Sequence, residues 1–324
     1  MTLAEIYRKY RPEILRLERR MEQQLLAEEQ TLKKASVHIM KAGGKRIRPV
    51  FVLLSAQFGP SKTAEEVERV AVPLEMIHMA SLVHDDVIDN ADLRRGKATI
   101  KERWDNRTAM YTGDYLFARA IEIASSSSYP DVHEILSMAM REMCVGEIEQ
   151  LRDQFQLDQN LRTYLRRIKR KTALLISVSC ELGALVSGGD ERTRRALRRY
   201  GYFAGMAFQV TDDILDFVGS EKQLGKPAGS DLIQGNITYP ALYAMEHNPE
   251  FYDSVKHYML KPEVYPLPIS QAVEAVKQSG AVEASKKLAA SYVKKAHEAL
   301  DELDQNEASA SLREIASYIG NRQF

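Results

Sequence analysis

The stretch of residues 72–90, VPLEMIHMASLVHDDVIDN, decides what kind of fold this chain can adopt. Its first part, Val72–Val83, carries few charges and is apolar on nearly every side when it is drawn as a helix. A helix of that kind lies in the middle of a large helical core. Three aspartates follow it, Asp85, Asp86 and Asp89. Acidic groups at the end of an apolar stretch indicate the mouth of an apolar cavity.

The same arrangement occurs a second time in residues 208–219, which read FQVTDDILDFVG. Both segments contain the pattern DDxxD, whose first and last aspartates lie four residues apart and share one face of a helix. Two such carboxylates, about 5–6 Å apart, repel each other by roughly 3 kcal/mol at an effective dielectric constant of about 20. One copy is commonly a solvated acidic helix face, whereas two copies behind apolar runs indicate cation binding.

Clusters made of carboxylate oxygens alone suit a hard cation, and we predict Mg²⁺. This ion usually takes one or two carboxylates and leaves its other positions to water and phosphate oxygens. The predicted metal ligands are the aspartates of the two clusters: Asp85, Asp86, Asp89, Asp212, Asp213 and Asp216.

Outward from these segments the chain continues to favour helices. No proline lies between Pro130 and Pro227 or after Pro268, and an interior proline breaks a helix. Apolar residues recur at helical spacing in many windows, and Thr172–Val186 is a second stretch with few charges. No long Gly/Ser linker divides the sequence. We therefore predict an all-α fold with little or no sheet, formed by one domain over residues 1–324.

Composition excludes several classes of protein. The chain has 45 Lys and Arg against 45 Asp and Glu, so no net field draws it to nucleic acid or to an acidic membrane. Two cysteines without a CxxC spacing exclude a disulfide scaffold and a cysteine-ligated zinc site. The charged N-terminus is unlike a signal peptide, and no apolar run approaches the ~20 residues needed to span a bilayer. We expect a cytoplasmic protein without a transmembrane segment.

Basic residues accompany the acidic clusters. Arg94 and Arg95 follow the first cluster, and the upstream segment GGKRIRP places Lys45 and Arg48 next to a glycine pair. Arginine and lysine side chains bind phosphate oxygens. The glycine pair either brings backbone N–H groups close to a phosphate or ends a helix. GGKRIRP alone is a weak signal, but together with the aspartates it indicates a ligand rich in phosphate.

These motifs together resemble the trans-prenyl diphosphate synthases. Six segments occur in the family's order and at its spacing: GGKRIRP, LVHDDVIDNADLRRG, GDYLFARA, KTALLISVSC, FQVTDDILDF and LGKPAGSDLIQGNITYP. The resemblance runs from about residue 20 to the C-terminus. It implies a single helical bundle of the isoprenoid synthase type around a deep apolar cavity, with the aspartate clusters facing each other across its mouth.

The resemblance also implies roles for individual residues. Catalytic roles fall to Asp85, Asp89, Lys171 and Asp212. Contacts to isopentenyl diphosphate fall to Lys45, Arg48, His78 and Arg95. Contacts to the allylic diphosphate fall to Arg94, Lys171, Thr172, Gln209 and Lys226. Without the resemblance, His78 would be interpreted as a core histidine, and Lys171–Thr172 as an ordinary helix surface.

The activity implied is Mg²⁺-dependent, consecutive condensation of isopentenyl diphosphate onto an allylic diphosphate such as farnesyl diphosphate. Product length depends on the side chains at four, five and eight residues before Asp85, which are Ser81, Ala80 and Ile77. Family members with short products carry aromatic rings at the first two positions. Because both are small here, the growing tail can pass, and we predict a long product.

One position departs from the family pattern, because Asn236 stands where many members have a lysine. The same asparagine resembles the heteromeric subgroup, whose catalytic subunit works with a small, non-catalytic partner; pairing of large subunits is a further expectation. A homomeric synthase making six to ten units is the alternative. Two alternatives from other functional classes are an isoprenoid cyclase and a non-catalytic regulatory subunit. The product is expected to pass to the membrane, so that the enzyme can be peripheral there.

Overall fold

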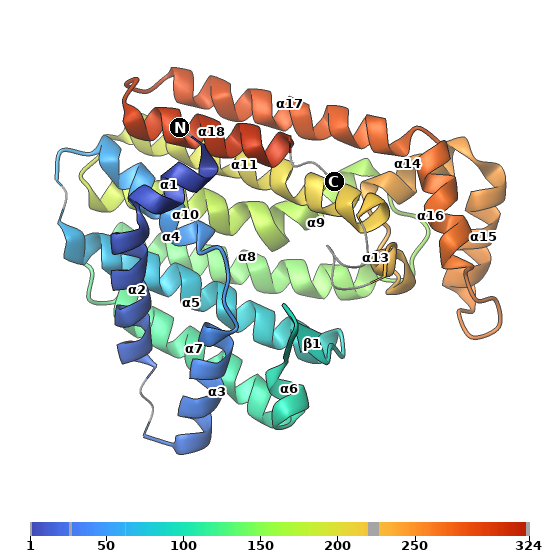
Figure 1. Ribbon diagram of the computed structural model, residues 1–324, viewed down its shortest axis with the longest axis horizontal. Coiled ribbons are helices and arrows are strands. Elements are labelled where there is room, and N and C mark those ends of the chain that lie inside the picture. The colour runs from blue at the N-terminus through green and yellow to red at the C-terminus, as the bar shows by residue number, and fades with distance from the viewer. Residues whose placement is uncertain (1, 26–27, 62, 220–226, 322–324) are drawn as a thin grey trace. The chain divides into compact units, whose positions relative to one another are not determined.

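Figure 1 shows the computed structural model, which describes residues 2–25, 28–61, 63–219 and 227–321. The predicted all-α architecture is confirmed. Among the described residues, the strands are two, each of two residues, Leu93–Arg94 (β1) and Lys97–Ala98 (β2), and they pair with each other.

The helices of the N-terminal part are α1 (Leu3–Lys9), α2 (Arg11–Gln24), α3 (Gln30–Lys41), α4 (Ile47–Ser55), η1 (Ala56–Phe58), α5 (Ala64–Ile88), α6 (Ile100–Arg103), α7 (Asn106–Ala124) and α8 (Asp131–Asp153). The middle of the chain forms α9 (Leu161–Ile168), the π-helical turn η2 (Lys169–Ala173), α10 (Leu174–Val186) and α11 (Glu191–Val218). The C-terminal part forms α13 (Ser230–Ile233), α14 (Tyr239–His247), α15 (Pro249–Leu260), α16 (Ile269–Gln278), α17 (Ala281–Asp301) and α18 (Glu307–Gly320).

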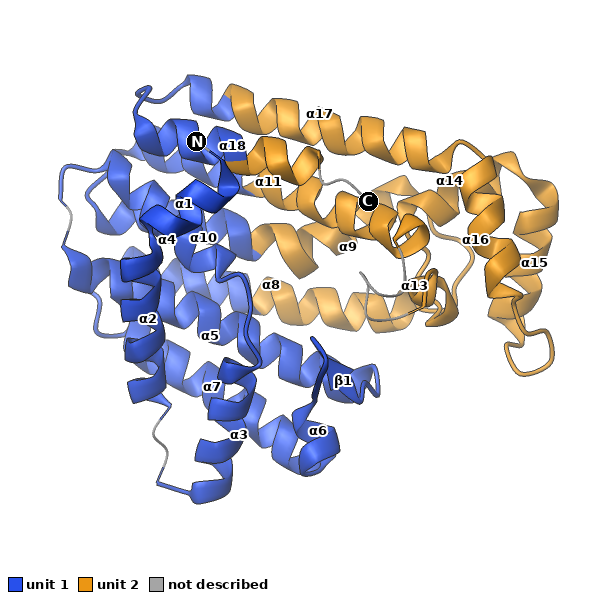
Figure 2. Cartoon of the chain, viewed as in Figure 1, with its two compact units in different colours: residues 1–140, 175–201, 299–314 blue, residues 141–174, 202–298, 315–324 orange. Residues whose placement is uncertain are grey.

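Two compact units are distinguished by colour in Figure 2. Unit 1 comprises residues 1–140, 175–201 and 299–314, and unit 2 comprises residues 141–174, 202–298 and 315–324. The chain passes between the units within α8, α11, α17 and α18 and at the start of α10. The single domain over residues 1–324 stays a prediction.

Helix α5 is the central helix of unit 1. It packs most extensively against α7 and also contacts α4, α2 and α3. Its residues between Val70 and Ala80 are buried apart from His78, as expected for a helix that is apolar nearly all round. Glu65 and Glu66 lie in its first turn, where the partial positive charge of the helix N-terminus favours carboxylates. The helix ends at Ile88, inside the first aspartate cluster.

The chain turns sharply after α5. Arg95 and Gly96, with φ of 54° and 75°, form the two-residue turn between β1 and β2. Two successive positive φ values are typical of a type I′ hairpin turn, and glycine adopts them without steric cost. Arg94 and Arg95 therefore lie on a hairpin that folds back after the helix, and not on a continuation of the helix.

Unit 2 contains α14, which contacts α9, α15 and α16. In the same unit, residues 202–218 of α11 carry the second aspartate cluster close to the helix end at Val218. Both aspartate clusters thus lie at the C-terminal ends of long helices. Among the described residues, no helix is both long enough and apolar enough to cross a membrane.

Candidate functional site

The first aspartate cluster spans the last turn of α5. Asp89 caps the helix, and its backbone N–H donates to the carbonyl of Asp85 at 2.8 Å, so the two residues lie one turn apart as predicted. Asp85 is half-buried and Asp89 is exposed. The partial negative charge at a helix C-terminus disfavours carboxylates unless a cation is close. Asp85 and Asp89 therefore form an electronegative end that suits a cation.

Asp86 has a different environment from its neighbours. It is 2% exposed, and its Oδ1 accepts a hydrogen bond of 2.7 Å from Nε of Arg94 on the hairpin. Burial raises the pKa of Asp86, and the nearby Arg94 guanidinium opposes that shift. The backbone carbonyl of Asp86 also accepts from the N–H of Ala91 at 2.9 Å. Asp86 and Arg94 thus hold the hairpin against α5, although sequence reasoning predicted both as ligand contacts.

A small cationic cleft lies beside this end of α5 in unit 1. It is lined by Ile39, Ala42, Gly43, Arg46, Glu75, His78, Met79, Leu82, Arg94 and Arg95. The predicted contacts to isopentenyl diphosphate, His78 and Arg95, are thus brought together in one cleft. Lys45 is exposed and is not among the lining residues. The Arg95 guanidinium lies close to the backbone of Gly44: a Cβ atom added at Gly44 would be 2.4 Å from Nη1 of Arg95.

Arg48 is the buried cation near this cleft. Burial lowers the pKa of its guanidinium to about 10, and Arg95 adds to the shift while Glu75 opposes it. Its Nε has no hydrogen-bond partner among the described residues. A buried donor without a partner is costly and indicates that an anion completes the site. Burial and the surrounding arginines also hold the pKa of His78 well below its usual range, so its imidazole is neutral at pH 7.

Arg46, a basic residue of the GGKRIRP segment, and Glu75 are among the residues that line this cleft, and their ion pair was not predicted from the sequence. Arg46 is 6% exposed, has φ of 48°, and donates to Glu18 at 2.9 Å, Glu75 at 3.0 Å and the Met40 carbonyl at 2.7 Å. It therefore joins α2, α3 and α5. Glu75 is the only charged residue in the stretch Val72–Val83, and this isolation was the available signal.

The second aspartate cluster lies in unit 2. Asp212 is half-buried, whereas Asp213 and Asp216 are buried. Asp216 accepts from the Ser230 hydroxyl at 2.9 Å and from the Asp231 N–H at 3.3 Å, which ties α13 to the end of α11. Burial, together with the charge of Asp231, raises the pKa of Asp213 to about 7. The three aspartates therefore differ in function, and Asp212 is the most exposed of them.

A chain of hydrogen bonds connects three predicted residues of unit 2. The Thr172 hydroxyl donates to Oε1 of Gln209 at 2.6 Å, and Nε2 of Gln209 donates to Asp213 at 2.9 Å. Nζ of Lys171 donates to Gln150 at 3.1 Å. Lys171 and Thr172 lie in the π-helical turn η2, a feature that occurs frequently at functional sites.

Two further residues named in the sequence analysis belong to the segment that follows α11 in the chain. Lys226 lies outside the described residues. The Asn236 N–H donates to the Asp231 carbonyl at 2.8 Å, and its buried Oδ1 has no partner among the described residues. The two aspartate clusters belong to different units, and their facing each other across one cavity mouth stays a prediction.

Tyr164 was also missed, and it holds Asp213 in place. Its ring is fully buried, and its hydroxyl donates to Oδ2 of Asp213 at 2.6 Å. Arg167 lies over the same ring at 5.9 Å and donates to the Ile237 carbonyl at 2.5 Å. Arg167 belongs to a run of basic residues but is only 7% exposed, so it is packed in the interior and does not lie on a solvated face.

The Tyr164 contact can be tested by stability. We expect Tyr164→Phe to lower the free energy of unfolding by about 1–3 kcal/mol, because Asp213 loses a buried hydrogen-bond donor. Urea denaturation followed by circular dichroism measures the change. Tyr252→Phe is the control, because Tyr252 is 38% exposed, and it should change stability by less than about 0.5 kcal/mol. Equal losses in the two variants would contradict the role of the Tyr164 hydroxyl.

An apolar cavity of about 550 Å³ lies in unit 1 between α5, α7 and α8. It is lined by Ile77, Ala120, Ile121, Ala124, His133, Glu134, Leu136, Ser137 and Met140. Ile77, Ser81 and Asp85 are spaced four residues apart on α5 and therefore follow one side of the helix. Ile77 lies about 12 Å along the axis from Asp85, at 1.5 Å per residue. The cavity thus lies two turns beyond the aspartates, and no Phe, Tyr or Trp occurs between Ile77 and Asp85.

The donor set of both clusters fits a hard cation with an incomplete protein shell. Within the described ranges, no three His, Cys, Asp or Glu side chains converge to hold a metal ion by themselves. Asp86, Asp213 and Asp216 are engaged by protein donors. A cation at Asp85 and Asp89 would therefore take most of its ligands from water or from a bound diphosphate. This is the arrangement that Mg²⁺ commonly adopts.

Comparison with known proteins gives consistent matches over the whole chain. Component 2 of heptaprenyl diphosphate synthase from Bacillus subtilis is 52% identical over 95% of this chain and 87% of that protein. The protein of the same name from Geobacillus stearothermophilus is 50% identical over 100% of both chains.

Solved structures agree with these relatives. Heptaprenyl diphosphate synthase from Staphylococcus aureus superimposes with a TM-score of 0.92 at 41% identity, over 96% of this chain and 98% of that one. A polyprenyl synthase from Caulobacter crescentus, crystallised with calcium and isoprenyl diphosphate, gives 0.93 at 32% identity, over 99% and 98%. Residues 29–276 match the sequence pattern of polyprenyl synthetases. The chain therefore belongs to the polyprenyl synthetase family.

Proposed function

We propose that the chain is the catalytic subunit of a heptaprenyl diphosphate synthase, a long-chain trans-prenyltransferase. It condenses isopentenyl diphosphate consecutively onto an allylic diphosphate such as farnesyl diphosphate and supplies the side chain of a quinone, menaquinone. The observation that carries this conclusion is the apolar cavity of about 550 Å³ two helical turns beyond Asp85. A cavity at that depth suits a long apolar tail whose diphosphate is held at the aspartates. Support also comes from the relatives named heptaprenyl diphosphate synthase component 2.

The first cluster would hold Mg²⁺ through Asp85 and Asp89, and the second chiefly through Asp212. Bound Mg²⁺ stabilises the negative charge that develops on a departing diphosphate. Asp86 and Asp213 position their neighbours through their contacts with Arg94 and Tyr164. The polyprenyl synthase crystallised with calcium and isoprenyl diphosphate supports a divalent cation at this kind of site.

Isopentenyl diphosphate would bind at the cationic cleft of unit 1. Arg48 offers a buried guanidinium with a free Nε, and Arg95 and Lys45 add charge at the surface. His78 stays neutral there, so it can donate a hydrogen bond without adding a fourth positive charge. Arginine forks match diphosphate oxygens in geometry as well as charge.

The allylic diphosphate would contact Lys171, Thr172 and Gln209 in unit 2. Ionisation of the allylic C–O bond produces a cation that the double bond of isopentenyl diphosphate attacks. Loss of a proton, to the released diphosphate, leaves the chain longer by one unit. The apolar walls of the cavity exclude water, which would otherwise quench the cation. The condensation requires no protein nucleophile.

The name component 2 implies that these relatives work with a partner component. For this chain we propose a small, non-catalytic subunit in a hetero-oligomer, with pairing of the large subunits. We place the enzyme in the cytoplasm, peripheral to the membrane that receives the product.

The purified chain should be incubated with radiolabelled isopentenyl diphosphate, farnesyl diphosphate and Mg²⁺, alone and with a candidate small subunit. We expect a product of seven isoprene units only when both subunits are present. Activity of the chain alone, with six to ten units, would indicate a homomeric synthase. A cyclised product would identify a cyclase, and no elongation under either condition would identify a non-catalytic subunit.

A further inference from the structure

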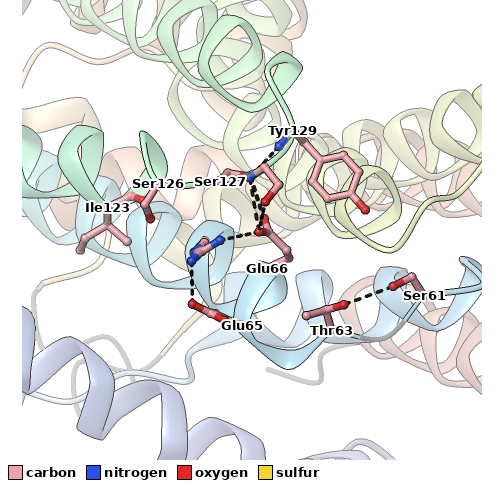
Figure 3. Close-up of polar contacts among 10 residues, drawn as sticks. Ser61, Thr63, Glu65, Glu66, Ile123, Ser126, Ser127 and Tyr129 are labelled. Atoms are coloured by element: carbon pink, nitrogen blue, oxygen red, sulfur yellow. Dashed lines mark hydrogen bonds and ion pairs between the residues drawn. The ribbon is translucent and has the colours of Figure 1, made fainter.

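Glu66 makes a cluster of contacts that the proposed mechanism does not use. It lies in the first turn of α5 and is 7% exposed. Figure 3 shows its carboxylate directed at the loop between α7 and α8. The hydroxyls of Ser127 and Ser128 each donate to it at 2.9 Å, and the Ser128 N–H donates at 3.3 Å. Arg69, one turn along α5, donates to it at 2.5 Å.

These contacts keep the carboxylate charged although it is buried. Burial raises the pKa of Glu66, but the hydrogen bonds from Ser128, Ser127 and Arg69 together outweigh it and leave the pKa below its usual value. Residues 125–128 are all serine, so this part of the loop has no apolar side chain to bury. Its attachment to α5 therefore depends on polar contacts, and Glu66 provides several of them.

The loop held by Glu66 joins two walls of the apolar cavity. Ala124, the last residue of α7, lines the cavity, and so does His133 in the first turn of α8. The loop of residues 125–130 is the only connection between these two helix ends along the chain. Because a short loop limits how far the helix ends that it joins can separate, its attachment to α5 chiefly fixes how close these ends of α7 and α8 lie to α5.

The contact between Glu66 and the loop is remote from the reacting groups. Glu66 precedes Asp85 by 19 residues, which corresponds to about 28 Å along the helix axis. Only the far end of a long tail reaches such a depth. A change here should therefore leave the first condensation intact and alter the late ones.

We infer that Glu66 is a positioning residue that, by holding the α7–α8 loop on α5, fixes the far wall of the tail cavity and so limits product length. This inference rests on the proposed function. Without Glu66 the loop and the helix ends that it joins can move away from α5, the cavity becomes deeper, and elongation continues beyond its normal end.

The test compares product lengths from Glu66→Ala with those of the unaltered chain, both assembled with the small subunit. We expect the fraction of products longer than the normal one to rise at least threefold. The rate of the first condensation onto farnesyl diphosphate should stay within twofold. Radiolabelled products separated by chromatography give both quantities.

Two further variants separate this role from simple loss of stability. Glu65→Gln is the matched control, because Glu65 binds the same Arg69 at 2.6 Å and, among the described residues, makes no hydrogen bond to the loop. Its product lengths should equal those of the unaltered chain. The double substitution Ser127→Ala with Ser128→Ala leaves Glu66 paired with Arg69 and should lengthen products as Glu66→Ala does. It also serves as the test if Glu66→Ala does not fold.

Three outcomes would overturn the inference. Unchanged product lengths in the serine variant or in folded Glu66→Ala would show that the contact does not limit elongation. An equal loss of turnover at every step, without longer products, would show a purely structural role. The third outcome concerns the unaltered chain: if it makes no polyprenyl product with or without the small subunit, the proposed function is overturned as well. The unaltered chain alone therefore distinguishes this outcome from the first two.

Discussion

Asp85→Ala is expected to abolish condensation, with a loss of at least about 1000-fold in turnover, or about 4 kcal/mol of transition-state stabilisation. Asp85 is half-buried at the C-terminal end of α5, in line with Ile77 of the cavity. The hairpin residue Arg94 pairs with Asp86, the neighbour of Asp85 in the cluster. Without the Asp85 carboxylate the cation loses a ligand, and the negative charge on the departing diphosphate is no longer balanced.

The measurement is incorporation of radiolabelled isopentenyl diphosphate at saturating Mg²⁺ with the complete enzyme. Asp92→Ala is the control, because Asp92 is exposed, lies just beyond the cluster and pairs with Lys101 at 2.8 Å. It should retain activity within about twofold. Circular dichroism confirms that both variants fold. Activity of Asp85→Ala within threefold of the unaltered chain would contradict its role as a metal ligand.

Ser81→Phe is expected to shorten the product to a few isoprene units. Ser81 lies one helical turn before Asp85 and one turn after Ile77, so its side chain lies beside the path from the aspartates to the cavity. It is half-buried, and its hydroxyl donates only to the His78 carbonyl of its own helix at 2.9 Å. A phenyl ring at this position would close the path. The ring would lie about one turn of helix, 5.4 Å along the axis, from Asp85, so the tail would end well short of Ile77.

Chromatography of radiolabelled products measures the effect, and Ser81→Ala is the matched control because it removes the hydroxyl without adding volume. The control should keep the normal product length. Ala80→Phe is expected to shorten the product too, but Ala80 is fully buried, so part of its effect will be loss of stability. An unchanged length distribution in folded Ser81→Phe would sink the idea that this position limits the tail.

The main outlines of the fold followed from the sequence because they depend on local pattern. Apolar residues at helical spacing, the absence of proline from long stretches and two segments with few charges predicted an all-α chain. Segments with clustered glycine or serine at residues 42–45, 125–130 and 188–190 lie between helices in the structure. Helix formation depends on near neighbours in the chain, so such features can be derived from a single sequence.

The hairpin after α5 shows where local pattern was insufficient. The sequence placed Arg94 and Arg95 after the aspartates but did not show that the chain reverses at Arg95 and Gly96. That reversal brings Arg94 back to Asp86 and Arg95 to Gly44, which precedes it by 51 residues. Contacts of this kind depend on turn geometry and on packing between distant segments.

The sequence by itself determined the helical class, the two aspartate clusters and the small side chains that precede Asp85 by one turn, because residue type and helical spacing are sufficient for each. Only the tertiary structure decided which members of each cluster are engaged by the protein. Asp86 and Asp213 are aspartates like their neighbours in the two clusters. Yet Asp86 accepts a hydrogen bond from Arg94, and Asp213 accepts one from Tyr164. The same is true of Glu66, whose serine partners lie 61 and 62 residues away. Burial and long-range hydrogen bonds separate identical side chains into different functions, and neither property is present in the chain before it folds.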